Sequence, residues 1–243
     1  MDQEVFDAYL DLEKTHFWRL GKRRLVLEWL EAHSPPSDGR VLDVGGAACL
    51  VTRELRRYGE VTVVEPDEDM VDIVRRSTPF GVLQGGFPGL PVEGPFDVIT
   101  LLDVLEHLDD DHGALVELRG LLRPGGVFML TVPAYMWLWS EHDVILHHKR
   151  RYTRTQLVQR LHGAGFEVLR ASYYTSVLLP AMAAQRMAAL VTSTLRPKQE
   201  AHYRTKTPPA PINGLFGHIM DLERRVLRST SLPAGGSIIA VCR

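Results

Sequence analysis

Short apolar runs alternate with amphipathic segments along most of the chain. The runs Val41–Val44, Val61–Val64, Phe96–Leu102 and Val127–Val132 have the length and the apolar or β-branched character of buried strands. The segments between them, such as Pro66–Arg76, carry their apolar residues at helical spacing. Because buried parallel strands are joined by helices that cross the sheet, this order predicts an α/β fold with a doubly wound, mostly parallel sheet.

Weaker patterns complete the expected set of elements. A third strand is expected at Val82–Gln84, and last strands at Phe166–Ala171 and Ser237–Val241 bring the expected total to seven. The leader Val5–Leu30 predicts two short helices, and the apolar segment Tyr173–Leu195 predicts an amphipathic helix. Further helices are expected at Cys49–Tyr58, His112–Leu122 and Gln156–Ala164, the last opened by a capping box of Thr153 and Gln156.

The chain is expected to form one folded unit. A length of 243 residues suits a single large α/β domain, and the hydrophobic share of 45% is enough for a full core. A run of Ser, Pro, Asp and Gly at residues 34–39 ends the leader helices. We therefore expect an N-terminal helical cap over residues 1–38 and a domain over residues 39–243, with a helical insertion at about residues 173–230 before the last strand.

The first predicted strand ends in a turn with few side chains, Asp43–Cys49, which reads DVGGAAC. The second strand ends at Glu65, and an acid at this spacing can accept hydrogen bonds from two ribose hydroxyls. Because glycines let the backbone approach a ligand closely, these features predict a pocket for an adenosine-bearing cofactor. The alternative is a tight strand–helix turn followed by a solvated glutamate. A dinucleotide is less favoured, since the G-x-G-x-x-G spacing that brings a pyrophosphate to a helix N-terminus is absent.

Several motifs, in order, resemble those of class I S-adenosylmethionine (SAM) methyltransferases: Val41–Cys49, Val63–Pro66, Phe96–His107 and Leu122–Gly126. Other segments resemble a bacterial small-molecule subgroup of that family, so the resemblance covers nearly the whole chain. It implies a Rossmann-like class I methyltransferase fold whose seventh strand, Ser237–Val241, is antiparallel to the rest. The segments that resemble the subgroup are His16–Arg19, Val132–Tyr135, Trp139, His142, Asp143, Arg150–Tyr152 and Leu232–Ser237.

The resemblance implies SAM as the cofactor, with roles carried over position by position. Asp43 and Gly45 would border its methionine moiety, and Glu65 would bind its ribose hydroxyls. Leu102 and Asp103 would form the floor near the transferred methyl group. The expected cofactor-binding residues are Asp43, Gly45, Gly46, Ala47, Glu65, Pro66, Leu102 and Asp103.

The chain departs from the family pattern at three positions. Ala47 and Cys49 stand where the family usually has glycine, and Gly86 stands where an acidic residue often contacts the adenine. We expect Ala47 and Cys49 to have negative φ, so that the turn still accommodates SAM. If either needed positive φ, its side chain would strain the turn, and this would be a decayed cofactor site.

Candidate general bases lie at two places near the expected site. His107 follows the fourth strand, and His142 lies in the long aromatic loop Tyr135–Tyr152 after the fifth. The Arg and Tyr side chains of this loop either contact the acceptor or only anchor the loop to the next helix. No metal is expected, because the histidines of the loop lack zinc-type spacing and no cysteine assists them. The expected acceptor-binding residues are Tyr135, Trp139, His147, Arg151 and Tyr152.

Composition limits the partners and the compartment. The formal net charge is −2 and the pI is about 6.6, so no nucleic-acid partner is expected despite the short basic run at residues 149–151. The two distant cysteines, and an N-terminus without a basic region followed by an apolar run, favour a cytoplasmic location. The leading prediction is a SAM-dependent methyltransferase that acts on a small molecule in a biosynthetic pathway, such as secondary metabolism.

Two other functions stay open. A SAM-binding protein that no longer methylates, such as a cyclase-type enzyme or a regulatory subunit, would account for Ala47, Cys49 and Gly86. A peripheral membrane contact would use residues 173–195, whose interrupted apolar pattern does not suit a membrane span but can lie on a membrane surface.

Overall fold

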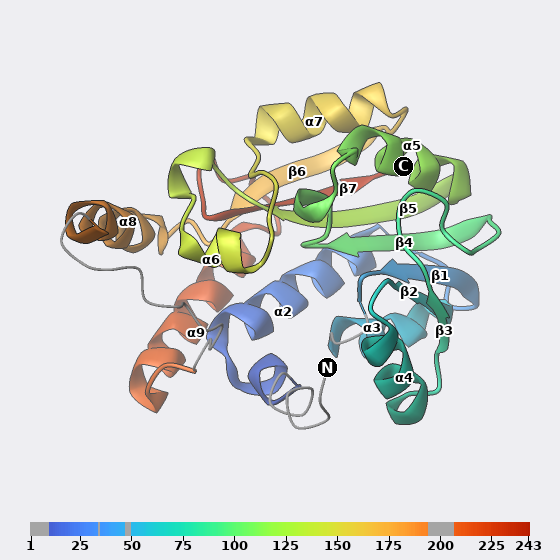
Figure 1. Ribbon diagram of the computed structural model, residues 1–243, viewed down its shortest axis with the longest axis horizontal. Coiled ribbons are helices and arrows are strands. Elements are labelled where there is room, and N and C mark those ends of the chain that lie inside the picture. Colours follow the sequence, from blue (N-terminus) through green and yellow to red (C-terminus); the bar gives the residue numbers. More distant parts are fainter. Residues whose placement is uncertain (1–9, 34, 47–49, 194–206) are drawn as a thin grey trace.

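The computed structural model describes residues 10–33, 35–46, 50–193 and 207–243, and a mixed sheet forms the middle layer of this part of the chain (Figure 1). Seven strands are described, in the order β3-β2-β1-β4-β5-β7-β6. β7 is antiparallel to both of its neighbours, whereas the other neighbouring pairs are parallel. The predicted α/β class and the reversed last strand are confirmed. The strands are β1 (Gly39–Val44), β2 (Gly59–Glu65), β3 (Gly81–Gln84), β4 (Phe96–Leu102), β5 (Leu122–Pro133), β6 (Val168–Tyr174) and β7 (Ser237–Cys242).

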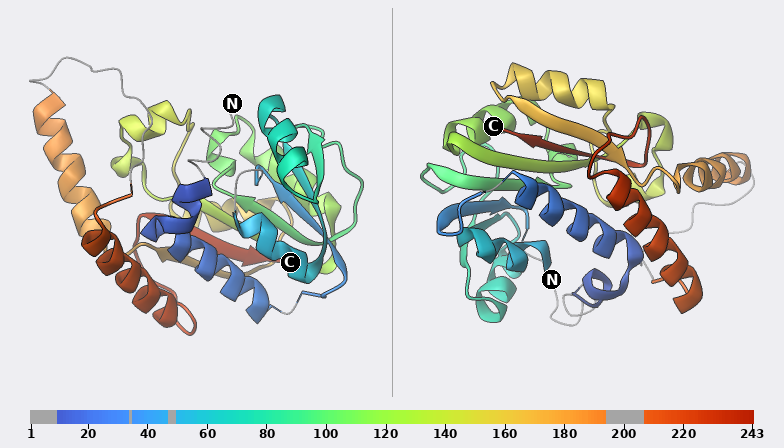
Figure 2. Two further views of the ribbon diagram at one scale, coloured as in Figure 1. Left: turned by 90° about the horizontal axis from the view of Figure 1, so that it is seen from below. Right: turned by 180° about the vertical axis from the view of Figure 1, so that it is seen from behind.

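Helices cover both faces of the sheet (Figures 1 and 2). Helices α2, α3, α4 and α9 share one buried apolar cluster with one face, and α5 and α7 share a second cluster with the other. The loop after β5, expected to be long, contains two short helices, η3 and α6. The helices are α2 (Phe17–Ala32), α3 (Leu50–Leu55), η1 (Arg56–Tyr58), α4 (Glu68–Ser77), η2 (Leu105–His107), α5 (Asp111–Leu121), η3 (Met136–Leu138), α6 (Glu141–Ile145), α7 (Arg154–Gly163), α8 (Leu179–Ser193) and α9 (Ala210–Val226).

Local sequence explains where several helices begin. Asp67 caps α4, because its carboxylate accepts a hydrogen bond from the Met70 amide at 2.9 Å. Thr153 and Gln156 form the predicted capping box at the start of α7. The order of the parallel strands then brings the carboxyl ends of β2, β1, β4 and β5 to one edge of the sheet, where ligands of such folds bind.

The helix expected over Tyr173–Leu195 begins instead at Leu179. Tyr173 and Tyr174 belong to β6, where they pair with β7. Their side chains are buried in the sheet, so they extend the strand that was expected over Phe166–Ala171. Aromatic residues suit both a strand and an apolar helix, and pairing with β7 decides between the two.

The insertion between β6 and β7 leaves and re-enters the sheet at one place. The buried Glu223 carboxylate of α9 accepts hydrogen bonds from the amides of Ser176 at 2.6 Å and Val177 at 3.1 Å. At the other end, the Leu232 amide donates to Ser172 Oγ at 2.8 Å. α9 packs along α2, whereas α8 extends away from the sheet (Figure 1). In the described part of the chain, no helix is long and apolar enough to cross a membrane.

Candidate active site

The turn after β1 leaves almost no room for side chains. Gly45 has φ +73°, a left-handed conformation, and its amide donates to the Val64 carbonyl at 2.8 Å. A Cβ on Gly45 would lie 2.6 Å from Val104 Cγ2, and a Cβ on Gly46 would lie 1.9 Å from a carboxylate oxygen of Asp43. The turn therefore presents bare backbone at the carboxyl edge of the sheet.

Asp43 braces this turn from inside. Its buried carboxylate accepts hydrogen bonds from the hydroxyls of Thr52 at 2.5 Å and Thr100 at 2.6 Å. The Thr52 hydroxyl also lies 2.8 Å from the Gly46 carbonyl oxygen. Burial raises the pKa of Asp43, although both hydroxyls favour its charged form. Asp43 thus positions the backbone of the turn.

Glu65 ends β2 beside this turn. Its Oε1 accepts a hydrogen bond from the Asp67 amide at 3.2 Å, and among the described residues no group donates to its Oε2. Burial raises the pKa of Glu65, and the Asp67 amide opposes that shift. Pro66 is exposed next to it, and a Cβ on Gly86 would lie 3.6 Å from Pro66 Cβ, an ordinary contact. Glu65 therefore keeps one carboxylate oxygen that no described group of the protein occupies.

Asp103 follows the buried Leu102 at the end of β4 and is held by a lysine. Lys22 Nζ of α2 donates to Asp103 Oδ2 at 2.8 Å, and the Thr131 hydroxyl donates to Oδ1 at 2.8 Å. Lys22 is 5% exposed, and its Nζ lies 5.0 Å from the centre of the Trp18 ring. Burial alone would raise the pKa of Asp103, but Lys22 and Thr131 lower it. These contacts also hold Asp103 at φ +56°, a strained conformation for a residue with a side chain.

Lys22 is absent from the residues predicted above, although the sequence carries a signal for it. It lies on the buried side of α2, one and two turns before Val26 and Trp29. A charge on the apolar face of a helix indicates a buried partner, because burial without one is costly. Arg19, one turn earlier, shows the same pattern and pairs with the buried Glu13.

A second polar cluster holds the loop after β5 in place. Asp143 of α6 is 0% exposed and accepts hydrogen bonds from Arg151 Nε at 2.7 Å and Nη2 at 3.0 Å. It also accepts from the Ser140 amide at 2.8 Å and lies 2.8 Å from His148 Nδ1. Burial alone would raise the pKa of Asp143, but His148 and Arg151 hold it far below its ordinary value. Asp143 is therefore the hub of this loop, in the sense that Ser140, His148 and Arg151 all bind its carboxylate.

Tyr152 joins the end of the loop to the core. Its side chain is buried, and its hydroxyl donates to Asp111 Oδ2 at 2.9 Å. Its amide donates to the Pro133 carbonyl at 3.0 Å, and its carbonyl accepts from the Tyr135 amide at 2.8 Å. Two roles were open for Arg151 and Tyr152, acceptor contact and anchoring of the loop. The contacts that they make attach the loop to the core of the protein.

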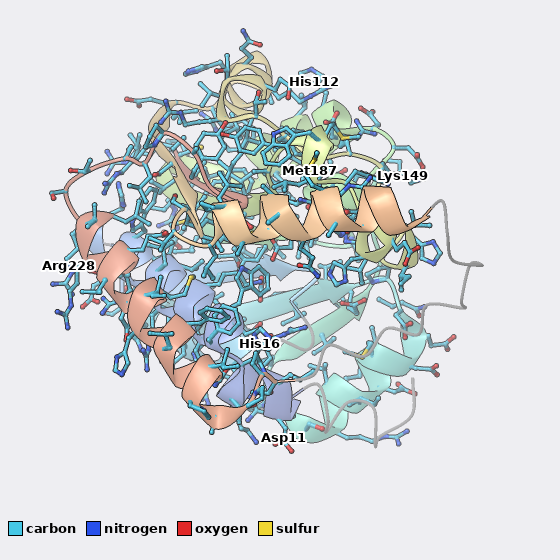
Figure 3. The ribbon with its side chains drawn as sticks, turned by 90° about the vertical axis from the view of Figure 1, so that its left-hand side faces the viewer. Asp11, His16, His112, Lys149, Met187 and Arg228 are labelled. Atoms are coloured by element: carbon cyan, nitrogen blue, oxygen red, sulfur yellow. The ribbon has the colours of Figure 1, made fainter. Side chains whose placement is uncertain are left out.

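The other predicted acceptor-binding residues, Tyr135, Trp139 and His147, and the candidate base His142 lie on the outer part of this loop. Tyr135 has φ +56° and stacks on Tyr173 with 5.1 Å between ring centroids. Trp139 is half-buried, whereas His142 and His147 are exposed. Figure 3 shows the molecule from this side, with α8 crossing in front. Contact of these four loop residues with an acceptor stays a prediction.

His107 of η2 lies against the same loop. Its ring meets the His148 ring edge to face, with centroids 4.7 Å apart. Burial, and then the neighbouring His148, lowers the pKa of His107, so the ring is neutral at pH 7 and able to accept a proton. Its role as general base stays a prediction. Glu106, which sequence reasoning missed, is buried next to it.

Comparison with known sequences agrees with this geometry. The chain matches the sequence profile of a family described as a methyltransferase domain over residues 16–171. A ubiquinone biosynthesis O-methyltransferase of Xanthomonas axonopodis pv. citri is 30% identical over 113 residues, which are 43% of this chain and 47% of that protein. The chain therefore spans about half the length of the curated relatives it matches.

Solved structures share the fold. A chain from the complex of the Haloferax volcanii Trm112 methyltransferase activator has a TM-score of 0.60 at 18% identity, covering 100% of this chain and 97% of that one. The cyclase SpnF has a TM-score of 0.57 at 19% identity, covering 93% of this chain and 82% of that one. At such identities the likeness concerns the fold alone.

The profile covers more than half of the chain, so the chain belongs to the methyltransferase domain family, with the Rossmann-like fold of the class I enzymes. SAM, the cofactor that the resemblance implied, is the cofactor of this family of domains.

The described residues at the carboxyl edge fit this cofactor. The turn at Gly45 and Gly46 has no room for a Cβ, because Val104 and Asp43 fill the space that it would occupy, and glycine backbone of this kind can approach the methionine moiety closely. Glu65 keeps a carboxylate oxygen open towards a ribose hydroxyl. Ala47 and Cys49, for which we predicted negative φ, lie outside the described residues. The role of each single residue towards SAM stays a prediction.

Replacing Glu65 by alanine should weaken SAM binding at least tenfold. The variant loses charge-assisted hydrogen bonds worth roughly 1.5–3 kcal/mol, whereas the empty protein loses only the contact with the Asp67 amide. Calorimetric titration with SAM measures the effect, and Glu60→Ala, an exposed acid at the other end of β2, is the control. Equal SAM affinity of Glu65→Ala and wild type would remove Glu65 from the site.

Proposed function

We propose that this chain transfers the methyl group of SAM to a hydroxyl oxygen of a small, partly apolar acceptor in a biosynthetic pathway, secondary metabolism included. The observation that carries the proposal is the loop after β5, which begins at the edge where β4 and β5 end and contains Tyr135, Trp139 and His142. The name of the Xanthomonas relative, an O-methyltransferase, supports a hydroxyl acceptor. SAM supplies a methyl group on a positively charged sulfur, which is already a strong electrophile.

Residues of this chain then have three tasks. Tyr135 and Trp139 bind the apolar body of the acceptor, since aromatic rings bury large area and stack. The floor at Asp103 is fixed by Lys22, so the acceptor meets a rigid surface; orientation of this kind supplies up to roughly 7–11 kcal/mol. His142 takes the hydroxyl proton, a contribution of about 10²–10⁴-fold in rate. His107 is the second candidate for that proton.

A small molecule is favoured over a nucleic acid. The formal net charge is −2, and the basic run at residues 149–151 is already neutralised by acids. Lys149 pairs with Asp109 at 2.7 Å, Arg150 with Asp111 at 3.2 Å, and Arg151 with the buried Asp143. Cations engaged in this way release few counterions from a phosphate backbone, which is the main source of affinity for nucleic acids.

A peripheral membrane contact through residues 173–195 would deliver an apolar acceptor to this edge. Met187 on α8 is 63% exposed, and Met136 and Trp137 of η3 are exposed beside it. Such side chains suit the boundary of a bilayer. Sedimentation with lipid vesicles checks this part of the proposal. Wild type should sediment with the vesicles, whereas Trp137→Ser should stay in the supernatant.

The function is tested by His142→Ala, which should lower turnover by roughly ten- to a hundredfold while SAM affinity changes less than twofold, because a general base acts on the acceptor alone. Radiolabelled SAM and a panel of phenols and catechols give turnover, and calorimetry gives SAM affinity. His112→Ala, an exposed histidine on α5, is the matched control.

Other outcomes would contradict the proposal in different ways. Equal losses of turnover and SAM affinity in His142→Ala would make the loop a cofactor lid. Wild-type protein that binds SAM but methylates no member of a broad panel would favour a cyclase-type or regulatory function. Native mass spectrometry with no trace of SAM or its demethylated product would point to a decayed site.

A further inference from the structure

Three potential metal ligands meet beside the acceptor edge. One ligand atom from each of Glu106, His107 and His148 lies within 4.8 Å of the others. Glu106 and His107 belong to η2, directly after β4, whereas His148 comes from the loop after β5. Because His148 is distant in sequence from Glu106 and His107, the three residues form no zinc-type spacing, and no metal was predicted from the sequence.

Glu106 lacks a protein partner where a buried carboxylate needs one. Its side chain is 1% exposed, and no hydrogen bond reaches its Oε2 within the described residues. An unpaired buried carboxylate oxygen is costly, and native proteins rarely leave one without a function. The Lys149 amide donates to the Glu106 carbonyl at 2.7 Å, which fixes the His148 end of the loop next to η2. The unpaired oxygen thus lies in a rigid part of the fold.

His148 is already oriented as a ligand. Its Nδ1 lies 2.8 Å from Asp143 Oδ1, and Asp143 is itself fixed by two hydrogen bonds from Arg151. Because a carboxylate only accepts hydrogen bonds, Nδ1 carries the proton in the neutral ring, and Nε2 is then the nitrogen with the lone pair. Metal-bound histidines commonly have this arrangement, in which a carboxylate behind the ring sets its tautomer and raises its basicity.

We propose that Glu106, His107 and His148 bind one divalent transition-metal ion, with Zn²⁺ the best match to two imidazoles and a carboxylate. Ligands of one tetrahedral zinc lie about 3.3 Å apart, so binding draws the three side chains closer together than they are in the structure. The neighbouring Asp103 is not a ligand, because Lys22 and Thr131 already occupy its carboxylate.

The ion would complete the acceptor site of the proposed function, on which this role rests. Three protein ligands leave a coordination position open, as in catalytic zinc sites. An acceptor hydroxyl that binds there would be polarised and its pKa would fall towards neutrality, so that His142 takes its proton more readily. The oxygen would then carry the charge that methylation requires.

Metal binding is tested on the full chain without SAM or acceptor. After treatment with EDTA, the protein is titrated with ZnCl₂ in a calorimeter, and a parallel titration with Co²⁺ is followed by visible absorption. We expect one ion per chain with micromolar or tighter affinity. Glu106→Gln and His148→Ala should each weaken Zn²⁺ binding at least tenfold, and His147→Ala, the exposed neighbour, should leave it unchanged.

Folding of every variant is checked by circular dichroism, and Glu106→Gln keeps the shape of the side chain. A rise of the melting temperature with Zn²⁺ in wild type but not in Glu106→Gln is the second readout. No binding below about millimolar Zn²⁺, or equal binding by wild type and both ligand variants, would overturn the site. Zinc binding without any methyl transfer would uphold the site and reject the proposed function instead.

Discussion

Asp143→Ala should lower the free energy of unfolding by about 3–5 kcal/mol, because breaking a buried ion pair leaves the remaining charge without a partner. The Arg151 guanidinium, with 9% of its side chain exposed, would lose both of its carboxylate contacts. The Ser140 amide and His148 would lose their acceptor as well. Urea denaturation measures the loss, and the loop after β5 should become accessible to protease.

The matched control is Asp109→Ala, which removes a solvent-exposed acid that lies between η2 and α5 and contacts the loop after β5 through Lys149. Asp109 pairs with Lys149 at 2.7 Å, but exposed pairs contribute little, so stability should barely change. Similar stability of Asp143→Ala and Asp109→Ala would show that the loop is held by its backbone contacts, not by Asp143.

The pH dependence of stability follows from the same carboxylate. The pKa of Asp143 is lowered in the folded protein, so its contribution is complete above the unfolded value of about 3.9 and is lost as pH falls towards the folded pKa. Wild type should therefore lose stability below about pH 4 more steeply than Asp143→Asn does. Parallel slopes for the two proteins would contradict this contribution.

Gly46→Ala should reduce SAM affinity at least a hundredfold and lower the free energy of unfolding by about 1–3 kcal/mol. The new Cβ would lie 1.9 Å from Asp43 Oδ2, and Asp43 cannot retreat because Thr52 and Thr100 hold it from the other side. The turn itself must move, and the backbone that borders the cofactor moves with it. Calorimetry with SAM and urea denaturation measure the two effects.

Gly120 offers a matched glycine for this test. It lies inside α5, where a Cβ would meet nothing within 4 Å, so Gly120→Ala should leave SAM affinity unchanged and raise stability by about 0.5–1 kcal/mol. If Gly46→Ala also kept full SAM affinity, the turn after β1 would tolerate side chains, and its narrowness would have no part in cofactor binding.

Much of the fold could be predicted because buried parallel strands are apolar throughout. β4, buried along its whole length, was predicted with its observed bounds, Phe96–Leu102. The boundary between β6 and α8 was wrong, since Tyr173 and Tyr174 suit either element and only pairing with β7 separates the two. Local pattern carries no information on which distant strand completes a sheet.

Residues of the candidate site could be predicted where the neighbouring sequence marks them, as at the end of a predicted strand. Gly45 and Glu65 follow strands at a characteristic spacing, and both lie at the expected edge. Lys22 was missed because its partner Asp103 comes from a distant segment, and Glu106 because only the fold shows that it is buried next to His148. The function of Asp143 as a hub was also hidden, since it depends on a contact with Arg151 that only the folded loop creates.

The two ends of the insertion between β6 and β7 meet at one point, tied by Glu223 at the exit and by the Leu232 amide at the return. A segment that leaves and returns at one point can be lengthened, shortened or exchanged without altering the path of either strand. Evolution can thus vary α8 while α9, which packs along α2 and carries Glu223, keeps the junction in place. The same property makes this junction a natural place to graft insertions from related chains.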